Sequence, residues 1–115
     1  MTDDAFPLFH WAPTARRKQI TRYGLRPSMW SRDRAWRPPY VCFSADPEMA
    51  WGLSGMMDPD VSSWDLWLML SDVPSGYEEI WNTVRGTGEQ YVQEVRVYER
   101  IWKRDLWYVA TRTQT

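Results

Sequence analysis

Two stretches in the first half of the chain decide the fold: residues 8–27 read LFHWAPTARRKQITRYGLRP, and residues 40–50 read YVCFSADPEMA. The first stretch begins with a short apolar and aromatic run at residues 8–11, which lies between Pro7 and Pro13. Short aromatic runs bounded by prolines are typical of strands. The run therefore predicts a strand that contains the single histidine of the chain.

A helix is expected directly after this strand, over residues 14–23. Thr14 is placed to act as its N-cap, and Ile20 and Tyr23 have the spacing of a buried helical stripe. Gly24 follows at the position where a glycine commonly ends a helix. The remaining face of this helix is basic, so we expect it to face solvent or a charged ligand.

The second stretch predicts another strand and another short helix. Residues 40–44 are apolar enough for a strand. Asp46 is a suitable N-cap, with Pro47 at the first helical position and Glu48 beside the positive end of the helix dipole. We therefore expect a helix over about residues 47–53.

The rest of the chain reads mostly as strands. Residues 28–39 and 55–63 predict loops, whereas residues 77–83 fit either a strand or an irregular arm. Strands are expected at residues 64–70, 91–98 and 106–111, with turns at residues 74–76 and 86–88. The fold class is therefore α+β, with two short helices near the N-terminus and a single domain over residues 1–115.

Composition excludes several classes of protein. The chain has 115 residues with one cysteine and one histidine, so an intrachain disulfide is impossible and a structural zinc site is not expected. No run approaches the ~18 apolar residues of a membrane helix, and the acidic start is unlike a signal peptide. We expect a cytoplasmic protein with no membrane partner and no metal.

Charge and aromatic residues are unevenly distributed. Residues 1–45 carry eight Arg or Lys against three Asp or Glu, whereas residues 46–94 carry one Arg against ten acidic residues. A basic N-terminal third suits a phosphate-bearing ligand or nucleic acid, although a solvated charged face gives the same pattern. Nine tryptophans are more than a small core can hide, so several should line a groove or a contact surface.

Three segments in a fixed order carry side chains suited to catalysis. His10 lies in the first strand, Tyr40 and Cys42 lie in the second, and Glu94 lies in the alternating strand at residues 91–98. This order resembles the His–Tyr–Glu arrangement of the diphtheria-toxin and poly(ADP-ribose) polymerase branch of ADP-ribosyltransferases. It is also similar to DNA-modifying ADP-ribosyltransferase toxins and RNA 2′-phosphotransferases, which share a histidine strand followed by a helix ending in Gly-Leu.

Two further segments carry the same resemblance. Val41-Cys42-Phe43-Ser44-Ala45-Asp46 looks like the family's Val-Tyr-Phe-Ala-Asp passage from strand to helix. Residues 93–98, followed by residues 105–109, look like the family's terminal catalytic-glutamate strand and its partner. The resemblance implies a small ADP-ribosyltransferase-like fold, with two short N-terminal helices packed on a split, mainly antiparallel sheet, and NAD as the substrate.

The resemblance also implies roles for individual residues, with Glu94, His10 and Tyr40 as the catalytic set. Glu94 would stabilise the oxocarbenium-like ribose that forms as the nicotinamide–ribose bond breaks, and His10 would position a ribose. Tyr40 and Trp11 would sandwich the nicotinamide. Further contacts to NAD would come from Arg16, Arg17 and Arg26 at the pyrophosphate and from Cys42 and Ser44, while loop 28–39 would cover NAD or select the acceptor.

Departures from the family pattern leave the activity open. Trp11 follows His10 where the family often has glycine, and Cys42 takes the family's tyrosine position, although Tyr40 lies on the same face of the strand. Val92 stands where arginine-modifying members carry an acidic residue, which leaves nucleic acid, another side chain or water as acceptor. The alternatives are a non-catalytic nucleotide-binding or protein-interaction module of the same fold, or a small structural or assembly protein.

Overall fold

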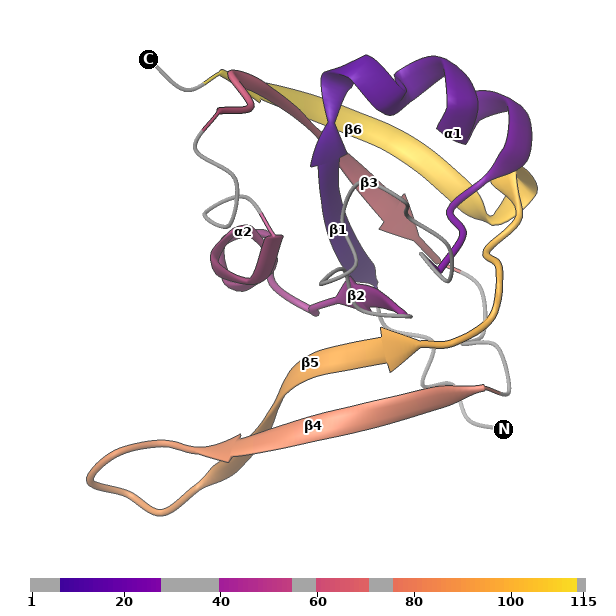
Figure 1. Cartoon of the computed structure of the whole chain (residues 1–115). Coiled ribbons are helices and arrows are strands. Elements are labelled where there is room, and N and C mark those ends of the chain that lie inside the picture. Colours follow the sequence, from indigo (N-terminus) through magenta and orange to yellow (C-terminus); the bar gives the residue numbers. More distant parts are fainter. Residues whose placement is uncertain (1–6, 28–39, 55–59, 71–75, 114–115) are drawn as a thin grey trace.

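The computed structural model describes residues 7–27, 40–54, 60–70 and 76–113. These residues form two three-stranded antiparallel sheets and two short helices, so the α+β class is confirmed (Figure 1). Sheet 1 has the order β1-β3-β6, and sheet 2 has the order β2-β5-β4. The strands are β1 (Leu8–Pro13), β2 (Val41–Phe43), β3 (Ser63–Met69), β4 (Tyr77–Thr83), β5 (Gln90–Val97) and β6 (Leu106–Thr113).

The helices lie close to their expected positions but differ in how they begin. A 3₁₀ turn, η1 (Thr14–Arg16), leads into α1 (Arg17–Tyr23), and Thr14 makes no capping bond. In contrast, α2 (Pro47–Ser54) begins as expected, because the Asp46 carboxylate accepts from the backbone N–H groups of residues 48 and 49. Since α2 follows β2 and lies near the middle of the chain, the description of both helices as N-terminal is not supported.

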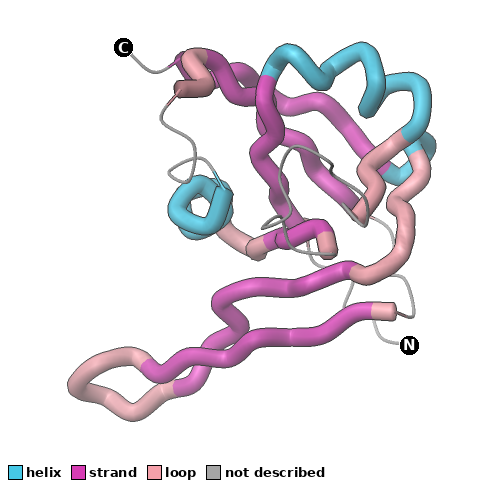
Figure 2. The backbone as a smooth tube through the Cα atoms, viewed as in Figure 1, coloured by secondary structure: helices cyan, strands magenta, loops and turns pink. Residues whose placement is uncertain are grey.

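Residues 77–83, which fit either a strand or an irregular arm, form strand β4. This strand pairs antiparallel with β5 along its whole length and makes a hairpin that extends from the rest of the molecule (Figure 2). A second short 3₁₀ turn, η3 (Lys103–Asp105), precedes β6. The loop at residues 28–39 lies outside the described residues.

The two sheets meet at one isolated bridge between β1 and β2. Phe9 and Ser44 exchange both backbone hydrogen bonds, with N···O distances of 2.7 and 3.0 Å. This bridge makes β2 the neighbour of β1, so the six strands follow the spatial order β4-β5-β2-β1-β3-β6. The six strands therefore lie in two antiparallel sheets that meet at this bridge, and the split between the sheets lies between β2 and β1.

The main core lies where strands of both sheets turn their apolar sides toward α1. Val95 and Val97 are fully buried, as their alternation along the strand predicts, and Ile20 is the buried residue of α1. The cluster consists of Leu8, Ala12, Ile20, Leu25, Val41, Phe43, Trp67, Met69, Val95, Val97, Ile101 and Leu106. It ties sheet 2 to sheet 1 beyond their single bridge.

A second core packs α2 against β1 and β3. Trp51 of α2 lies edge-on to Trp11 and to Trp64, with ring centroids 5.1 and 5.9 Å apart. The indole N–H of Trp11 donates to the Pro47 carbonyl at 2.8 Å, which satisfies its polar end. Several tryptophans are thus in the core, whereas Trp81, Trp102 and Trp107 are about half exposed.

Gly24 is required by the close approach of two backbones. Its φ is +79°, and a Cβ at this position would lie 2.0 Å from the Ile101 carbonyl oxygen. We therefore expect Gly24→Ala to lower the free energy of unfolding by more than about 1 kcal/mol. In α2, by contrast, a Cβ at Gly52 would meet nothing within 4 Å, so Gly52→Ala should stabilise the fold slightly. Urea denaturation of both variants measures the difference, and equal effects would contradict the packing seen at Gly24.

None of the helices in the described part of the chain is long and apolar enough to cross a membrane.

Candidate functional site

The three strands that carry the candidate catalytic residues are consecutive neighbours in space. His10 lies on β1 and Glu94 on β5, while Tyr40 lies directly before β2 and Cys42 within it, and the strand order places β2 between β1 and β5. These strands are far apart in the sequence, since β1 begins at residue 8 and β5 ends at residue 97. The sequence order alone did not establish this adjacency.

His10 lies where the two sheets separate. In an antiparallel pair, the hydrogen-bonded pair after Phe9–Ser44 would be Trp11 with Cys42. The strands diverge there, and the His10 Nδ1 lies 2.7 Å from the Cys42 carbonyl oxygen that such a pair would use. The imidazole thus replaces a backbone donor at the split, and its ring centroid lies 5.6 Å from that of Phe43.

This contact fixes the tautomer of His10. A carbonyl oxygen only accepts, so Nδ1 must carry the proton. In the neutral ring, Nε2 then bears the lone pair. An orientation fixed through one ring nitrogen is what a histidine needs if its other nitrogen is to bind a ribose hydroxyl.

Glu94 is a nearly buried carboxylate on the side of β5 that faces away from the main core. Its side chain forms an ion pair with Arg96, two residues along the same strand, and this hydrogen bond raises the pKa of the Arg96 guanidinium. Arg96 lies opposite Cys42 in the β2–β5 register. The contacts therefore run from Glu94 through Arg96 to the strand that His10 touches.

A β-bulge directly precedes Glu94. Ile80 of β4 pairs with Glu94, but the next residue, Trp81, pairs with Val92, so Gln93 is the extra residue. Bulges re-aim the side chains beside them and are frequent next to active sites. Here the bulge allows Val92 and Val95 to pack on the same core while Glu94 is turned away from it.

Ser44 provides a buried hydroxyl at the end of β2. It directly follows Phe43, the last residue of β2 paired with β5, and its backbone bridges to Phe9 of β1. Ser44 is 1% exposed, and its Oγ has no hydrogen-bond partner within the described part of the chain. A buried hydroxyl without a partner is costly, but this oxygen is closed to solvent, so a ligand does not reach it without a shift of its surroundings.

Tyr40 closes the same cluster at the start of β2. Its ring lies 5.6 Å from the ring of Tyr98, and the Arg96 guanidinium carbon lies 4.6 Å from its centroid. Burial raises the pKa of the Tyr40 hydroxyl, and the charge of Glu94 raises it further. The phenol is therefore neutral at physiological pH and near enough to Glu94 to respond to its charge.

The remaining predicted NAD contacts do not join this cluster. Trp11 is buried against α2, with its N–H bound to Pro47. Arg16 is exposed in η1, and Arg26 is exposed beside the ring of Tyr23. Arg17 instead binds the buried carboxylate of Asp65. The structure thus brings Tyr40, Cys42 and Glu94 together on the side of β2 and β5 that faces away from the main core. His10 alternates with Leu8 and Ala12 of the main core, so its side chain lies on the opposite side, where it contacts the Cys42 carbonyl and the Phe43 ring.

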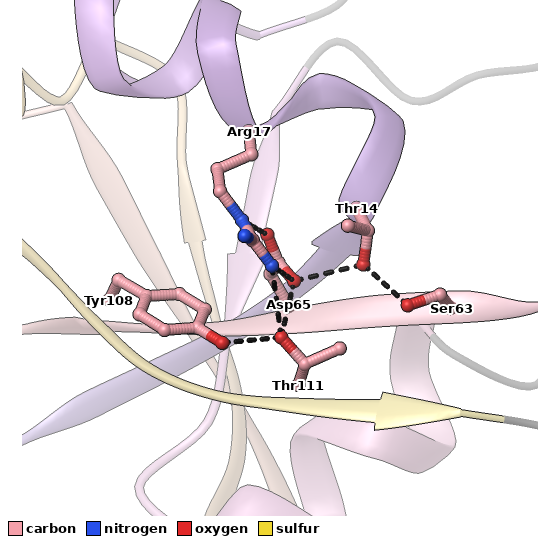
Figure 3. Close-up of polar contacts among 6 residues, drawn as sticks. All are labelled: Thr14, Arg17, Ser63, Asp65, Tyr108 and Thr111. Atoms are coloured by element: carbon pink, nitrogen blue, oxygen red, sulfur yellow. Dashed lines mark hydrogen bonds and ion pairs between the residues drawn. The ribbon is translucent and has the colours of Figure 1, made fainter.

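Asp65 is the centre of the most extensive polar network that the structure describes (Figure 3). It is 0% exposed and accepts hydrogen bonds from Arg17 (Nε 2.7 Å, Nη2 2.8 Å), Thr14 (2.9 Å) and Thr111 (2.8 Å). Since Thr14 donates to Asp65, the Ser63 hydroxyl 2.8 Å away must donate to Thr14. The network joins η1 and α1 to β3 and β6.

This network is a structural element that the sequence interpretation missed. Hydrogen bonds from Arg17 lower the pKa of the Asp65 carboxyl, so it is ionised and paired. A visible signal was the single carboxylate in the apolar run 64–69, because a buried charge must have partners. It also explains why Thr14 does not cap the helix.

Within residues 7–27, 40–54, 60–70 and 76–113, no three His, Cys, Asp or Glu side chains come together as metal ligands. In comparisons with protein-family models, curated proteins and solved structures, the chain has no match.

Proposed function

We propose that this chain is an ADP-ribosyltransferase-like protein that binds NAD at the split between β1 and β2. One observation carries the proposal: His10, Tyr40 and Glu94, the catalytic set that the resemblance implies, lie on or directly beside three strands that are neighbours in space. Their separation along the chain makes this adjacency informative, because only the fold can bring them together.

Glu94 is the catalytic residue of this proposal. In the reaction, the bond between the nicotinamide nitrogen and ribose C1′ breaks, and neutral nicotinamide leaves with the electron pair. The ribose gains oxocarbenium character, which a nearby carboxylate stabilises, and the acceptor then bonds to C1′ and releases a proton. A carboxylate held in place by Arg96 needs little reorganisation as this charge develops.

The neighbouring groups would bind and orient the substrate. His10, with its proton fixed on Nδ1, would accept a hydrogen bond at Nε2 from a ribose hydroxyl. The Tyr40 ring offers a flat surface for nicotinamide. Arg17 is assigned a structural role instead, because its guanidinium already binds Asp65.

The direct test is to incubate the protein with NAD and measure nicotinamide release, then to add labelled NAD with candidate acceptors. Nucleic acid is the first acceptor to try, since the chain presents arginine and aromatic side chains together. Release of nicotinamide supports the proposal. If no nicotinamide is released and no label is transferred, the transferase proposal fails.

Two substitutions separate the structural and functional roles of His10. Asn places an amide N–H near the position of Nδ1, so His10→Asn should keep the bond to Cys42 and retain near wild-type stability. His10→Ala leaves that carbonyl without its donor and should cost about 1 kcal/mol. Both variants lack Nε2, so both should lose NAD turnover, as urea denaturation and nicotinamide release would show. Full activity in His10→Asn would remove His10 from the ribose site.

A second candidate is a non-catalytic nucleotide-binding module, favoured by the ion pair that already occupies the Glu94 carboxylate. Calorimetric titration with NAD and ADP-ribose distinguishes the two. Tight binding without turnover, unchanged in Glu94→Ala, supports the module.

A further inference from the structure

Two basic segments that are far apart in sequence meet at the end of α1. Leu25 and Ile101 form an isolated antiparallel bridge, with both backbone N···O distances at 2.8 Å. The bridge places the basic end of α1 against residues 100–104, which lie between β5 and β6 (Figure 1). The two basic segments, around the end of α1 and at residues 100–104, thus form one continuous surface.

Arginines and aromatic rings alternate on this surface. Arg100 donates through Nε and Nη2 to the Tyr23 carbonyl at 2.8 and 2.6 Å, and its guanidinium carbon lies 4.0 Å from the Trp102 ring centroid. Arg22 and Arg26 lie over the Tyr23 ring, at 5.2 and 5.4 Å. We name this surface the α1–η3 patch, and it comprises Arg22, Tyr23, Arg26, Arg100, Trp102, Lys103 and Arg104.

The patch is positively charged and its rings are accessible. Trp102 is 49% exposed and Tyr23 is 39% exposed. Two acidic residues are close in sequence: the Glu99 side chain lies against Gly76, and Asp105 is half-buried at the end of η3. Five cations against these two carboxylates leave a clear excess of positive charge, which is a cost to the isolated protein.

We propose that the α1–η3 patch binds single-stranded nucleic acid. Guanidinium and ammonium groups neutralise phosphates, while flat exposed rings stack with unpaired bases, and proteins that bind single strands combine these two features. The exposed residues of α1 are polar or charged apart from Tyr23, so this helix does not present the apolar face that inserts into a lipid surface, and nucleic acid fits better than a membrane. The proposal extends the choice of nucleic acid as acceptor, but binding here requires neither NAD nor Glu94.

Fluorescence anisotropy with labelled single-stranded DNA and RNA, without NAD, tests this proposal over a series of salt concentrations. Arg26→Ala should reduce the slope of log affinity against log salt by about 0.7, the value for one phosphate contact on a single strand. Trp102→Ala should weaken binding by at least about fivefold through the loss of stacking. Lys103→Ala and Arg104→Ala each provide a second test of the charge.

Matched controls lie on the β4–β5 hairpin, at the opposite end of the molecule from α1 (Figure 1). Trp81 is 55% exposed and Arg85 is exposed near the hairpin tip. Trp81→Ala and Arg85→Ala should change affinity less than about twofold, and thermal melts check that all variants fold. The proposal is overturned if the controls weaken binding as much as the patch variants. It is also overturned if the wild type binds neither oligonucleotide, or binds only vesicles that contain phosphatidylserine.

Because this assay contains no NAD, its outcome is independent of turnover. Oligonucleotide binding without nicotinamide release would contradict only the transferase proposal. Nicotinamide release without oligonucleotide binding would contradict only the proposal that the α1–η3 patch binds nucleic acid.

Discussion

Replacing Asp65 with alanine should lower the free energy of unfolding by about 3 kcal/mol. The variant loses four hydrogen bonds to a buried charge and leaves the Thr14 and Thr111 hydroxyls without their acceptor. The estimate is at the lower end for a broken buried ion pair, because the Arg17 side chain is 45% exposed and can return to water. Urea denaturation measures this loss, which is a large share of the ~5–15 kcal/mol that stabilises a domain.

The same network makes stability depend on pH in a defined direction. The folded pKa of Asp65 lies below its ordinary value near 3.8, because Arg17 holds the ionised form. Its contribution is therefore fully present above pH ~4 and is lost as the pH falls through the folded pKa. In Asp65→Asn this part of the acid dependence should disappear.

Glu79→Gln on the exposed face of β4 is the control, with an expected effect within about 0.5 kcal/mol. If Asp65→Ala and Glu79→Gln were equally stable, the network in Figure 3 would not be a stabilising element.

Glu94→Gln should slow nicotinamide release by about 10²- to 10³-fold if the transferase proposal is correct. The amide keeps the size of the side chain but removes the negative charge that faces the developing oxocarbenium ion. Since the charge is needed chiefly in the transition state, the loss should fall on kcat and leave KM little changed. Initial rates over a range of NAD concentrations separate the two constants.

Two comparisons make this result specific. Glu89→Gln changes an exposed glutamate one residue before β5 and should retain activity. Arg96→Gln removes the partner of Glu94, so it tests whether the ion pair alone matters. Because Arg96 holds Glu94 in place, Arg96→Gln should lose less activity than Glu94→Gln. If Arg96→Gln lost more, Arg96 would be the residue that acts on NAD and Glu94 would only position it.

The sequence predicted the elements that local signals determine. Asp46 and Pro47 mark the start of α2, Gly24 follows the end of α1, and the alternation of Val95 and Val97 predicts the buried side of β5. These features depend on neighbours within one or two helical turns or on strand period. The sequence of residues 77–83 did not distinguish a strand from an irregular arm, because β4 is exposed along nearly all of its length and has no clear apolar side.

The candidate site was predictable only in part, because its partners are distant in sequence. The order of His10, Cys42 and Glu94 was visible, but the split that places His10 against the Cys42 carbonyl was not. Trp11 and Arg17 were expected at NAD, yet Trp11 binds Pro47, 36 residues away, and Arg17 binds Asp65, 48 residues away. A sequence pattern does not show which of several possible partners a side chain will choose.

The β4–β5 hairpin differs in contact order from the other strand pairs, because the β2–β5 pair of sheet 2 and both pairs of sheet 1 join strands that are far apart in sequence. Residues 84–89 connect β4 to β5, so that hairpin closes over a short loop, and hairpins of this kind form in about 1–10 μs. Residues 14–62 separate β1 from β3, and residues 70–105 separate β3 from β6, so sheet 1 must close two long loops before its contacts form. We therefore expect the β4–β5 hairpin to form early, and the Asp65 network, which gathers residues 14, 17, 65 and 111, to form only once sheet 1 has assembled.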